Sequence, residues 1–130
     1  MIVVDASAMV EVLLLSPVGR RLQSRLFAPG ETLHAPHLVD LEVAHVLRRY
    51  CLAGAITAER GREALEDLAG LPLTRHGHTP FVPRSWELRD NLTAYDAAYV
   101  ALAEFLEAPL ITRDGALARS GGHCAVVELV

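Results

Sequence analysis

The chain has 130 residues, of which 52% are hydrophobic and 22% are charged. This length fits a single domain at 1–130, and the composition excludes a disordered chain. The formal net charge is −4 and all 12 basic residues are arginine, so any mechanism that needs a lysine is excluded. No apolar run approaches the ~20 residues that a membrane-spanning helix requires. The first residues carry neither a basic region nor a cleavage pattern, so we expect a cytoplasmic protein without membrane association.

The chain alternates short apolar segments with helical patterns. In chain order we expect a strand at 2–5, helices at about 8–15 and 17–27, a strand at 32–35, helices at about 37–53 and 57–70, a strand at 71–74, helices at about 83–91 and 94–107, a strand at 109–112, a short helix at 114–120 and a strand at 125–129.

Several helix boundaries follow from residues that favour particular positions. Ser7 is a candidate cap for the first helix, and Pro36 is expected to open the third. Gly54 is expected in the left-handed conformation that ends many helices. Thr93 and Asp96 have the spacing of a capping box, with aspartate in place of glutamate.

Strands that alternate with helices predict an α/β domain with a mainly parallel central sheet of four to five strands and helices on both faces. Such sheets bind ligands at the carboxyl ends of their strands. Asp5 ends the first strand, and Asp114 follows the strand at 109–112. Glu42 and Asp96 fall near the starts of two helices. These four acids can therefore meet at one edge of the sheet.

Each acid also has a simpler structural interpretation. Asp96 and Asp114 suit helix starts, Glu42 suits a solvated helix face, and Asp5 suits a turn. Asp5 is the hardest to explain in this way, because a carboxylate directly after an apolar run is costly to bury without a partner. Clustered acids repel one another and raise one another's pKa values unless cations neutralise them. Ligands that are all oxygen atoms favour Mg²⁺ or Mn²⁺, which suit hydrolysis of a phosphodiester.

Other polar and apolar residues receive structural interpretations. No set of His and Cys has the spacing of a zinc site. Cys51 and Cys124 are expected to be small buried residues rather than a disulfide. Trp86 and Tyr95 suit either stacking on bases or packing in the core or an interface, and we favour packing. The apolar run at 10–15 exceeds what one amphipathic helix needs and indicates a subunit interface.

The four acids lie in segments whose order and spacing, over nearly the whole chain, resemble those of a known family. These segments are Val4–Ala8, Pro36–Val43, Leu92–Ala103 and Pro109–Asp114. The third is the most specific. The chain is similar to PIN-domain ribonucleases and, more narrowly, to the VapC toxins of bacterial toxin–antitoxin pairs.

The resemblance implies a PIN-like three-layer fold. It also implies an endoribonuclease that acts as the toxin of such a pair and cleaves RNA phosphodiester bonds with metal-activated water. The implied catalytic and metal-binding residues, with Mg²⁺ or Mn²⁺ as cofactor, are Asp5, Glu42, Asp96 and Asp114.

The resemblance further implies supporting residues and partners. Thr112 and Ser7 are implied as polar supporters, and Arg113, placed beside Asp114, is a candidate contact to RNA. Some PIN domains carry a further acid where this chain has Leu117, which argues against a fully occupied second metal site. The implied partners are an RNA substrate, a second copy in a homodimer, and a cognate VapB-type antitoxin whose tail covers the acidic groove.

Other functions compete with this interpretation. Phosphatases and receiver domains with an aspartate after the first strand also require a lysine, and this chain has none. The phosphatases further expect an acid where Ser7 stands. A PIN-fold RNA-processing nuclease outside a toxin–antitoxin pair remains an alternative, as does a catalytically silent PIN-fold binding module. The short chain favours the toxin, and the presence of all four acids argues against the silent module.

Overall fold

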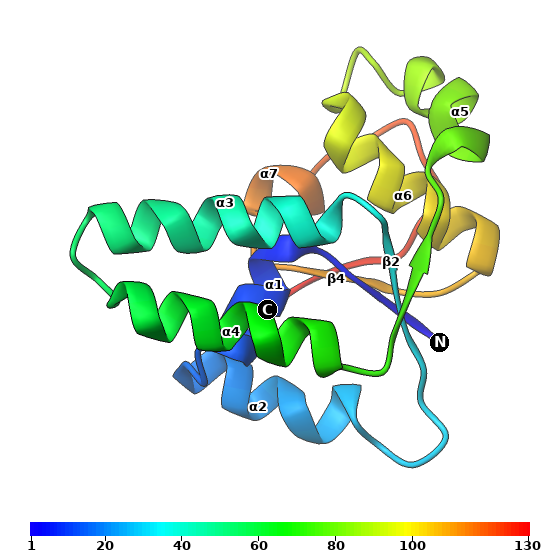
Figure 1. Cartoon of the computed structure of the whole chain (residues 1–130). Helices are drawn as coiled ribbons and strands as arrows, with labels where there is room; N and C mark the ends of the chain where they lie inside the picture. Colours follow the sequence, from blue (N-terminus) through cyan, green and yellow to red (C-terminus); the bar gives the residue numbers. More distant parts are fainter.

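The computed structural model describes all 130 residues and has a five-stranded sheet at its centre (Figure 1). The strands are β1 (Ile2–Val4), β2 (Leu33–Pro36), β3 (Leu73–His76), β4 (Leu110–Thr112) and β5 (Val127–Leu129). Their order in the sheet is β3-β2-β1-β4-β5, and every neighbouring pair is parallel. The prediction of a mainly parallel sheet is therefore confirmed, with β1 in the central position.

Helices cover both faces of the sheet, as predicted. They are α1 (Ala6–Leu13), α2 (Pro17–Leu26), α3 (Val39–Leu52), α4 (Ala58–Gly70), α5 (Val82–Glu87), α6 (Ala94–Leu106) and α7 (Gly115–Ala118), with a 3₁₀ turn, η1, at Thr79–Phe81. Figure 1 shows α1 to α4 gathered on one side of the sheet and α5 and α6 on the other. This division follows from right-handed crossovers, because the chain first moves from β1 outward to β3 and then returns across the sheet to β4.

The core is built mainly from small and branched aliphatic residues. All three residues of β1 are buried, and so are seven consecutive residues of α6 from Ala97 to Ala103. The alanines of α6 allow the helix to approach the sheet closely. Val10, Val12 and Leu13 are also buried, because α1 packs between the sheet and the neighbouring helices. The apolar run at 10–15 is therefore mostly core, and its apolar character does not by itself indicate a subunit interface.

The helix boundaries are partly as predicted. Thr93 caps α6, and Gly54 adopts a positive φ of 74° after α3. Ser7, however, lies inside α1, and Asp5 caps this helix instead. Pro36 is the last residue of β2, where it pairs with His76 of β3, rather than the first residue of a helix.

Two further predictions concern the cysteines and the absence of a membrane-spanning helix. Both cysteines are free: Cys51 is half-buried and Cys124 is exposed, so the prediction that both are buried is wrong. None of the seven helices combines the length and the apolar character needed to traverse a lipid bilayer.

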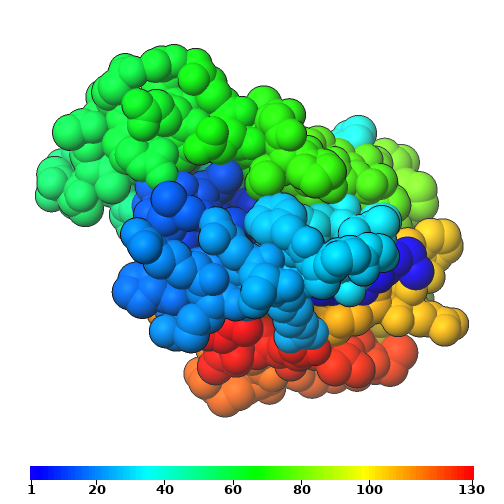
Figure 2. Space-filling view, turned by 90° about the horizontal axis from the view of Figure 1, so that it is seen from below, coloured from blue at the N-terminus to red at the C-terminus, as the bar shows by residue number.

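The C-terminal strand β5 is anchored to α2 on one face of the molecule. Figure 2 shows the blue helix α2 beside the red C-terminal segment. Arg25 of α2 forms an ion pair with Glu128 of β5, with Nη2 donating to Oε1 at 2.8 Å. This contact joins the edge strand β5 to the helical layer that covers β1.

Gly19 permits the close packing of α1 against α2. A Cβ atom added at Gly19 would lie 1.9 Å from the carbonyl oxygen of Glu11, which is backbone and cannot rotate away. We expect Gly19→Ala to lower the free energy of unfolding by about 1–3 kcal/mol, because the two helices must separate. Urea denaturation followed by circular dichroism measures this change.

Gly70→Ala is the matched control for this prediction, since a Cβ at Gly70 meets no atom within 4 Å. Gly70 ends α4, where alanine is tolerated at little cost. Equal unfolding free energies for the two variants would contradict the close approach of α1 and α2.

Candidate functional site

Asp5 occupies the junction between β1 and α1. Its side chain is 6% exposed and accepts three hydrogen bonds. Oδ1 accepts from the amide of Ala8 at 3.0 Å and from the hydroxyl of Ser7 at 2.7 Å, and Oδ2 accepts from the hydroxyl of Thr112 at 2.6 Å. Burial raises the pKa of Asp5 above its ordinary value, and these hydrogen bonds oppose the rise. The carboxylate is therefore fixed in position but destabilised when charged.

Thr112 and Ser7 link the ends of the two central strands. Thr112 is fully buried at the end of β4, and its hydroxyl also accepts from the amide of Asp114 at 2.9 Å. The hydroxyl of Ser7 accepts from the amide of Arg113 at 2.8 Å. Both side chains thus touch Asp5 and hold the loop after β4. These are the two residues that the family resemblance implied as polar supporters.

Glu42 lies near the start of α3 and faces α6. Its Oε2 accepts a hydrogen bond of 2.9 Å from the hydroxyl of Tyr99, whose ring is buried. Burial raises the pKa of Glu42, and the nearby charges of Asp96 and Asp5 raise it further. Burial and the charge of Glu42 also raise the pKa of Tyr99, so Tyr99 stays protonated and acts as a donor.

Asp96 and Asp114 complete the set of acids. Asp96 lies in the first turn of α6, where burial raises its pKa, with further contributions from the charges of Asp114 and Asp5. Asp114 is exposed and caps α7, accepting from the amides of Ala116 at 2.7 Å and Leu117 at 3.3 Å. The structural interpretation of Asp114 as the start of a short helix is therefore correct, and it leaves Oδ2 free for another contact.

Asp5 and Asp114 follow the ends of β1 and β4, where they cap α1 and α7, and Glu42 and Asp96 lie in the first turns of α3 and α6. The four acids share one edge of the sheet. They lie close enough that the charges of Asp5 and Asp96 raise the pKa of Glu42, and the charges of Asp5 and Asp114 raise the pKa of Asp96. No group of three or more Asp, Glu, His or Cys side chains surrounds a point where one ion would sit. The site is thus a set of neighbouring carboxylates, not a closed cage.

The sequence did not indicate how two further side chains lie, those of Arg113 and Tyr99. Arg113 turns toward the C-terminal end, where it contacts the carbonyl of Val130 and lies 3.6 Å from Glu11. It therefore does not point into the acids. Tyr99 was not identified from the sequence, although it follows Asp96 by three residues and so shares a helical face with it. Leu117, where some PIN domains carry an acid, is buried.

Comparison with known proteins identifies the family. The family model for the PIN domain matches residues 2–122. Ribonuclease VapC12 of Mycobacterium tuberculosis is 45% identical over 130 residues, which cover 100% of this chain and 99% of that protein. The chain belongs to the PIN-domain family and to its VapC branch.

Solved structures of the same branch have the same fold. VapC20 of M. tuberculosis, described as a toxin that cleaves the sarcin–ricin loop, superposes with a TM-score of 0.70 and 16% identity over 97% of this chain and 98% of its own. VapBC2 from Rickettsia felis, bound to a DNA fragment from its promoter, superposes with a TM-score of 0.69 and 15% identity over 99% of this chain and 98% of its own. At these identities the likeness concerns the fold, and it confirms the PIN-like three-layer architecture.

Thr112→Val tests the support of Asp5. Valine keeps the shape of threonine but removes the hydroxyl that donates to Oδ2 of Asp5. We expect the free energy of unfolding at pH 7.5, in chelator, to fall by about 1–3 kcal/mol, because a buried charge loses a donor. The loss should shrink as pH falls through the raised pKa of Asp5, because the protonated carboxyl needs this hydrogen bond less.

The control is Thr74→Val on β3, where the side chain is exposed and makes no side-chain hydrogen bond. Denaturant unfolding over a series of pH values from 7.5 downward measures both variants. If Thr112→Val costs the same throughout the series, the hydroxyl of Thr112 does not stabilise a charged Asp5.

Proposed function

We propose that the chain is a divalent-metal-dependent endoribonuclease that acts in the cytoplasm as the toxin of a toxin–antitoxin pair. The observation that carries this proposal is the set of four acids at one sheet edge in a chain of the VapC family. Three of them, Asp5, Glu42 and Asp96, have raised pKa values. Carboxylates whose charged forms are destabilised by their surroundings are expected at functional sites.

The donor atoms fit a hard divalent cation. The available ligands are carboxylate oxygens, which suit Mg²⁺ or Mn²⁺ rather than zinc. Mg²⁺ usually keeps several waters and binds through one or two carboxylates, so a closed cage is not required. We assign the ion to Asp5, Glu42, Asp96 and Asp114, whose mutual repulsion it would relieve. When bound, such an ion lowers the pKa of water and neutralises charge on a phosphodiester.

The chain's own side chains position these ligands. Thr112 and Ser7 hold the Asp5 carboxylate from both of its oxygens. Tyr99 orients Glu42 through Oε2 and leaves Oε1 free. Groups that orient metal ligands commonly matter 10–100-fold for metal affinity or activity, so we propose Tyr99 as a positioning residue.

Three partners follow from the family. A VapB-type antitoxin is supported by the VapBC2 pair among the structural neighbours, and a basic segment of such a partner would complement the acidic edge. The homodimer rests on the family resemblance alone, because the run at 10–15 lies mostly in the core. RNA is the proposed substrate on the basis of the VapC relatives.

Asp96→Asn is the test of the proposed activity. The purified chain is incubated with total cellular RNA and Mg²⁺ or Mn²⁺, and the new ends are mapped by sequencing. We expect discrete cuts that a chelator abolishes. Asp96→Asn should reduce their rate by about 100-fold or more, because loss of a ligand removes several kcal/mol of charge stabilisation.

Asp67→Asn, on the exposed surface of α4, is the charge-matched control and should cut normally. Mg²⁺ should also raise the unfolding temperature of the wild type and of Asp67→Asn, but not that of Asp96→Asn. Undiminished cutting by Asp96→Asn would refute the assigned site. Absence of both cutting and Mg²⁺ stabilisation in the wild type would favour a silent binding module.

A further inference from the structure

The side chain of Arg119 folds back over the start of α7, beside Asp114. A Cβ atom added at Gly115 would lie 2.8 Å from Nη1 of Arg119 and 3.6 Å from its Cζ. Long side chains on a helix lean toward its N-terminus, which brings residue 119 over residue 115. Gly115 directly follows Asp114, so the guanidinium rests against the backbone next to one of the four acids.

The charge of Arg119 has no partner within the chain. Its side chain is exposed, forms no ion pair and donates no hydrogen bond. Most other arginines are engaged: Arg20 and Arg89 donate to backbone carbonyls, and the arginines in ion pairs are Arg25, Arg60, Arg62, Arg75, Arg84 and Arg113. Arg119 is therefore free to donate to an incoming anion.

Other unpartnered arginines lie farther from the acids. Arg48 and Arg49 are exposed on α3, but they follow Glu42 by six and seven residues. At the rise of an α-helix this places them roughly 9–10 Å along the axis from Glu42. Arg21 lies on α2, which carries none of the four acids. Arg119 is thus the free cation that the backbone joins most directly to the acidic edge.

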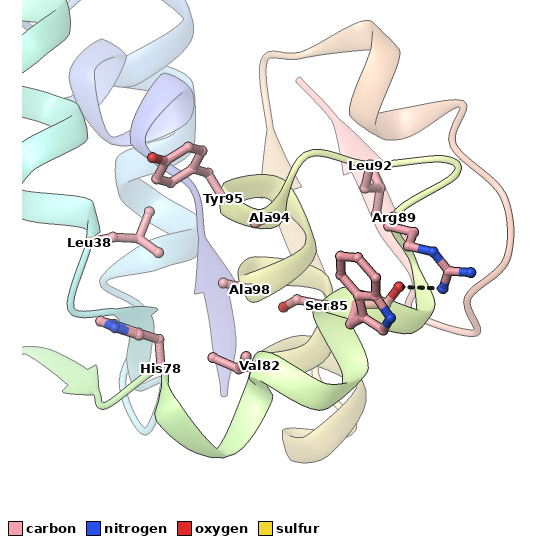
Figure 3. A pocket seen from close by; sticks show the side chains of 10 residues that line it. Leu38, His78, Val82, Ser85, Arg89, Leu92, Ala94, Tyr95 and Ala98 are labelled. Carbon is pink, nitrogen blue, oxygen red and sulfur yellow. Dashed lines mark hydrogen bonds between the residues drawn. The ribbon is translucent and has the colours of Figure 1, made fainter.

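Arg89 belongs to a different feature of the surface. Figure 3 shows it beside a cavity of about 460 Å³, with a hydrogen bond to the backbone carbonyl of Trp86. Trp86 and Tyr95 line this cavity and are 69% and 66% exposed, so they do not pack in the core. None of the four acids lines the cavity, and Arg89 therefore does not serve them.

We propose that Arg119 binds an RNA phosphate that adjoins the phosphodiester held at the acids. A guanidinium matches two phosphate oxygens with two parallel hydrogen bonds. A divalent ion would neutralise charge on the phosphodiester at the acids, whereas the adjoining phosphate keeps its charge and needs a cation from the protein. This inference rests on the proposed ribonuclease function and adds a substrate-binding residue to it.

A protein partner is the competing occupant of this position. A segment that complements the acidic edge is basic, and Arg119 would repel it. Phosphate is the group that suits both a metal ion at the acids and a free guanidinium beside them. The charges at this edge therefore favour RNA as the ligand of Arg119.

Binding of RNA tests the phosphate contact directly. In the Asp96→Asn chain, which is expected to leave RNA intact, the affinity for a labelled RNA decamer is measured by anisotropy in Mg²⁺ over a series of salt concentrations. We expect Arg119→Ala to weaken binding roughly 10-fold, because a hydrogen bond between charged groups is lost. It should also reduce the slope of log affinity against log salt by about 0.7, the value of one phosphate contact.

Two further variants control for charge. Arg119→Lys should keep the salt slope and recover part of the affinity, because lysine keeps the charge but not the two parallel hydrogen bonds. Arg62→Ala removes the same charge from the exposed surface of α4, where Arg62 pairs with Glu59 and Glu66. It should change neither the affinity nor the slope. Equal effects of Arg62→Ala and Arg119→Ala would contradict the proposal.

Gly115→Ala displaces the guanidinium without removing its charge. The new Cβ would lie too close to Nη1, so the flexible side chain of Arg119 must move away. The free energy of unfolding should not fall, because alanine favours a helix more than glycine does. Gly115→Ala should weaken RNA binding when Arg119 is present and add nothing to Arg119→Ala. Equal effects in both backgrounds would contradict a guanidinium positioned over Gly115.

The kinetics of cutting distinguish the possible failures. Arg119→Ala should raise the KM for RNA and leave kcat nearly unchanged, because a phosphate that does not react is bound equally in the ground and transition states. If the wild type cuts RNA but Arg119→Ala binds with unchanged affinity and salt slope, the contact is refuted and the ribonuclease stands. If the wild type cuts no RNA but binding depends on Arg119, the proposed function fails and the contact stands. If the Asp96→Asn chain binds no RNA, the contact is refuted.

Discussion

The buried carboxylate of Asp5 is the constraint on which the site depends. A charge with so little exposure is tolerated only when several donors satisfy it. Those donors come from α1 through Ala8 and Ser7, and from β4 through Thr112. The same contacts that satisfy the charge therefore fix where β1 ends, where α1 begins and how β4 lies beside β1. Fold and site are joined at this residue.

This arrangement leaves an electrostatic cost at the sheet edge. Asp5, Glu42 and Asp96 are each less stable when charged than they would be in water, because burial removes them from solvent. Neighbouring carboxylates add to this cost for Glu42 and Asp96. Sites that act on charged substrates often keep charged groups that are destabilised in the free protein. Binding of a ligand of opposite charge removes this destabilisation. A divalent cation is the ligand whose charge and oxygen preference match this edge.

The sequence was sufficient to predict the parallel sheet and to name the four candidate acids. Both depend on local signals, namely the alternation of strands with helices and the residues at the ends of strands. It was insufficient where tertiary contacts decide. Asp5 and Ser7 are both good caps two residues apart, and only the end of β1 selects Asp5. Tyr99 meets Glu42 only once α6 lies against α3. The exposure of Trp86 depends on how the short helix α5 sits, which no periodicity specifies.

The most direct test is a carbon-13 NMR titration of the carboxyl groups of Asp5, Glu42 and Asp96, with chelator and then with Mg²⁺. In chelator we expect each pKa to lie above its ordinary value, and Mg²⁺ should lower all three because it stabilises the charged forms. Ordinary pKa values in chelator that Mg²⁺ leaves unchanged would contradict the acids as a strained, metal-binding set.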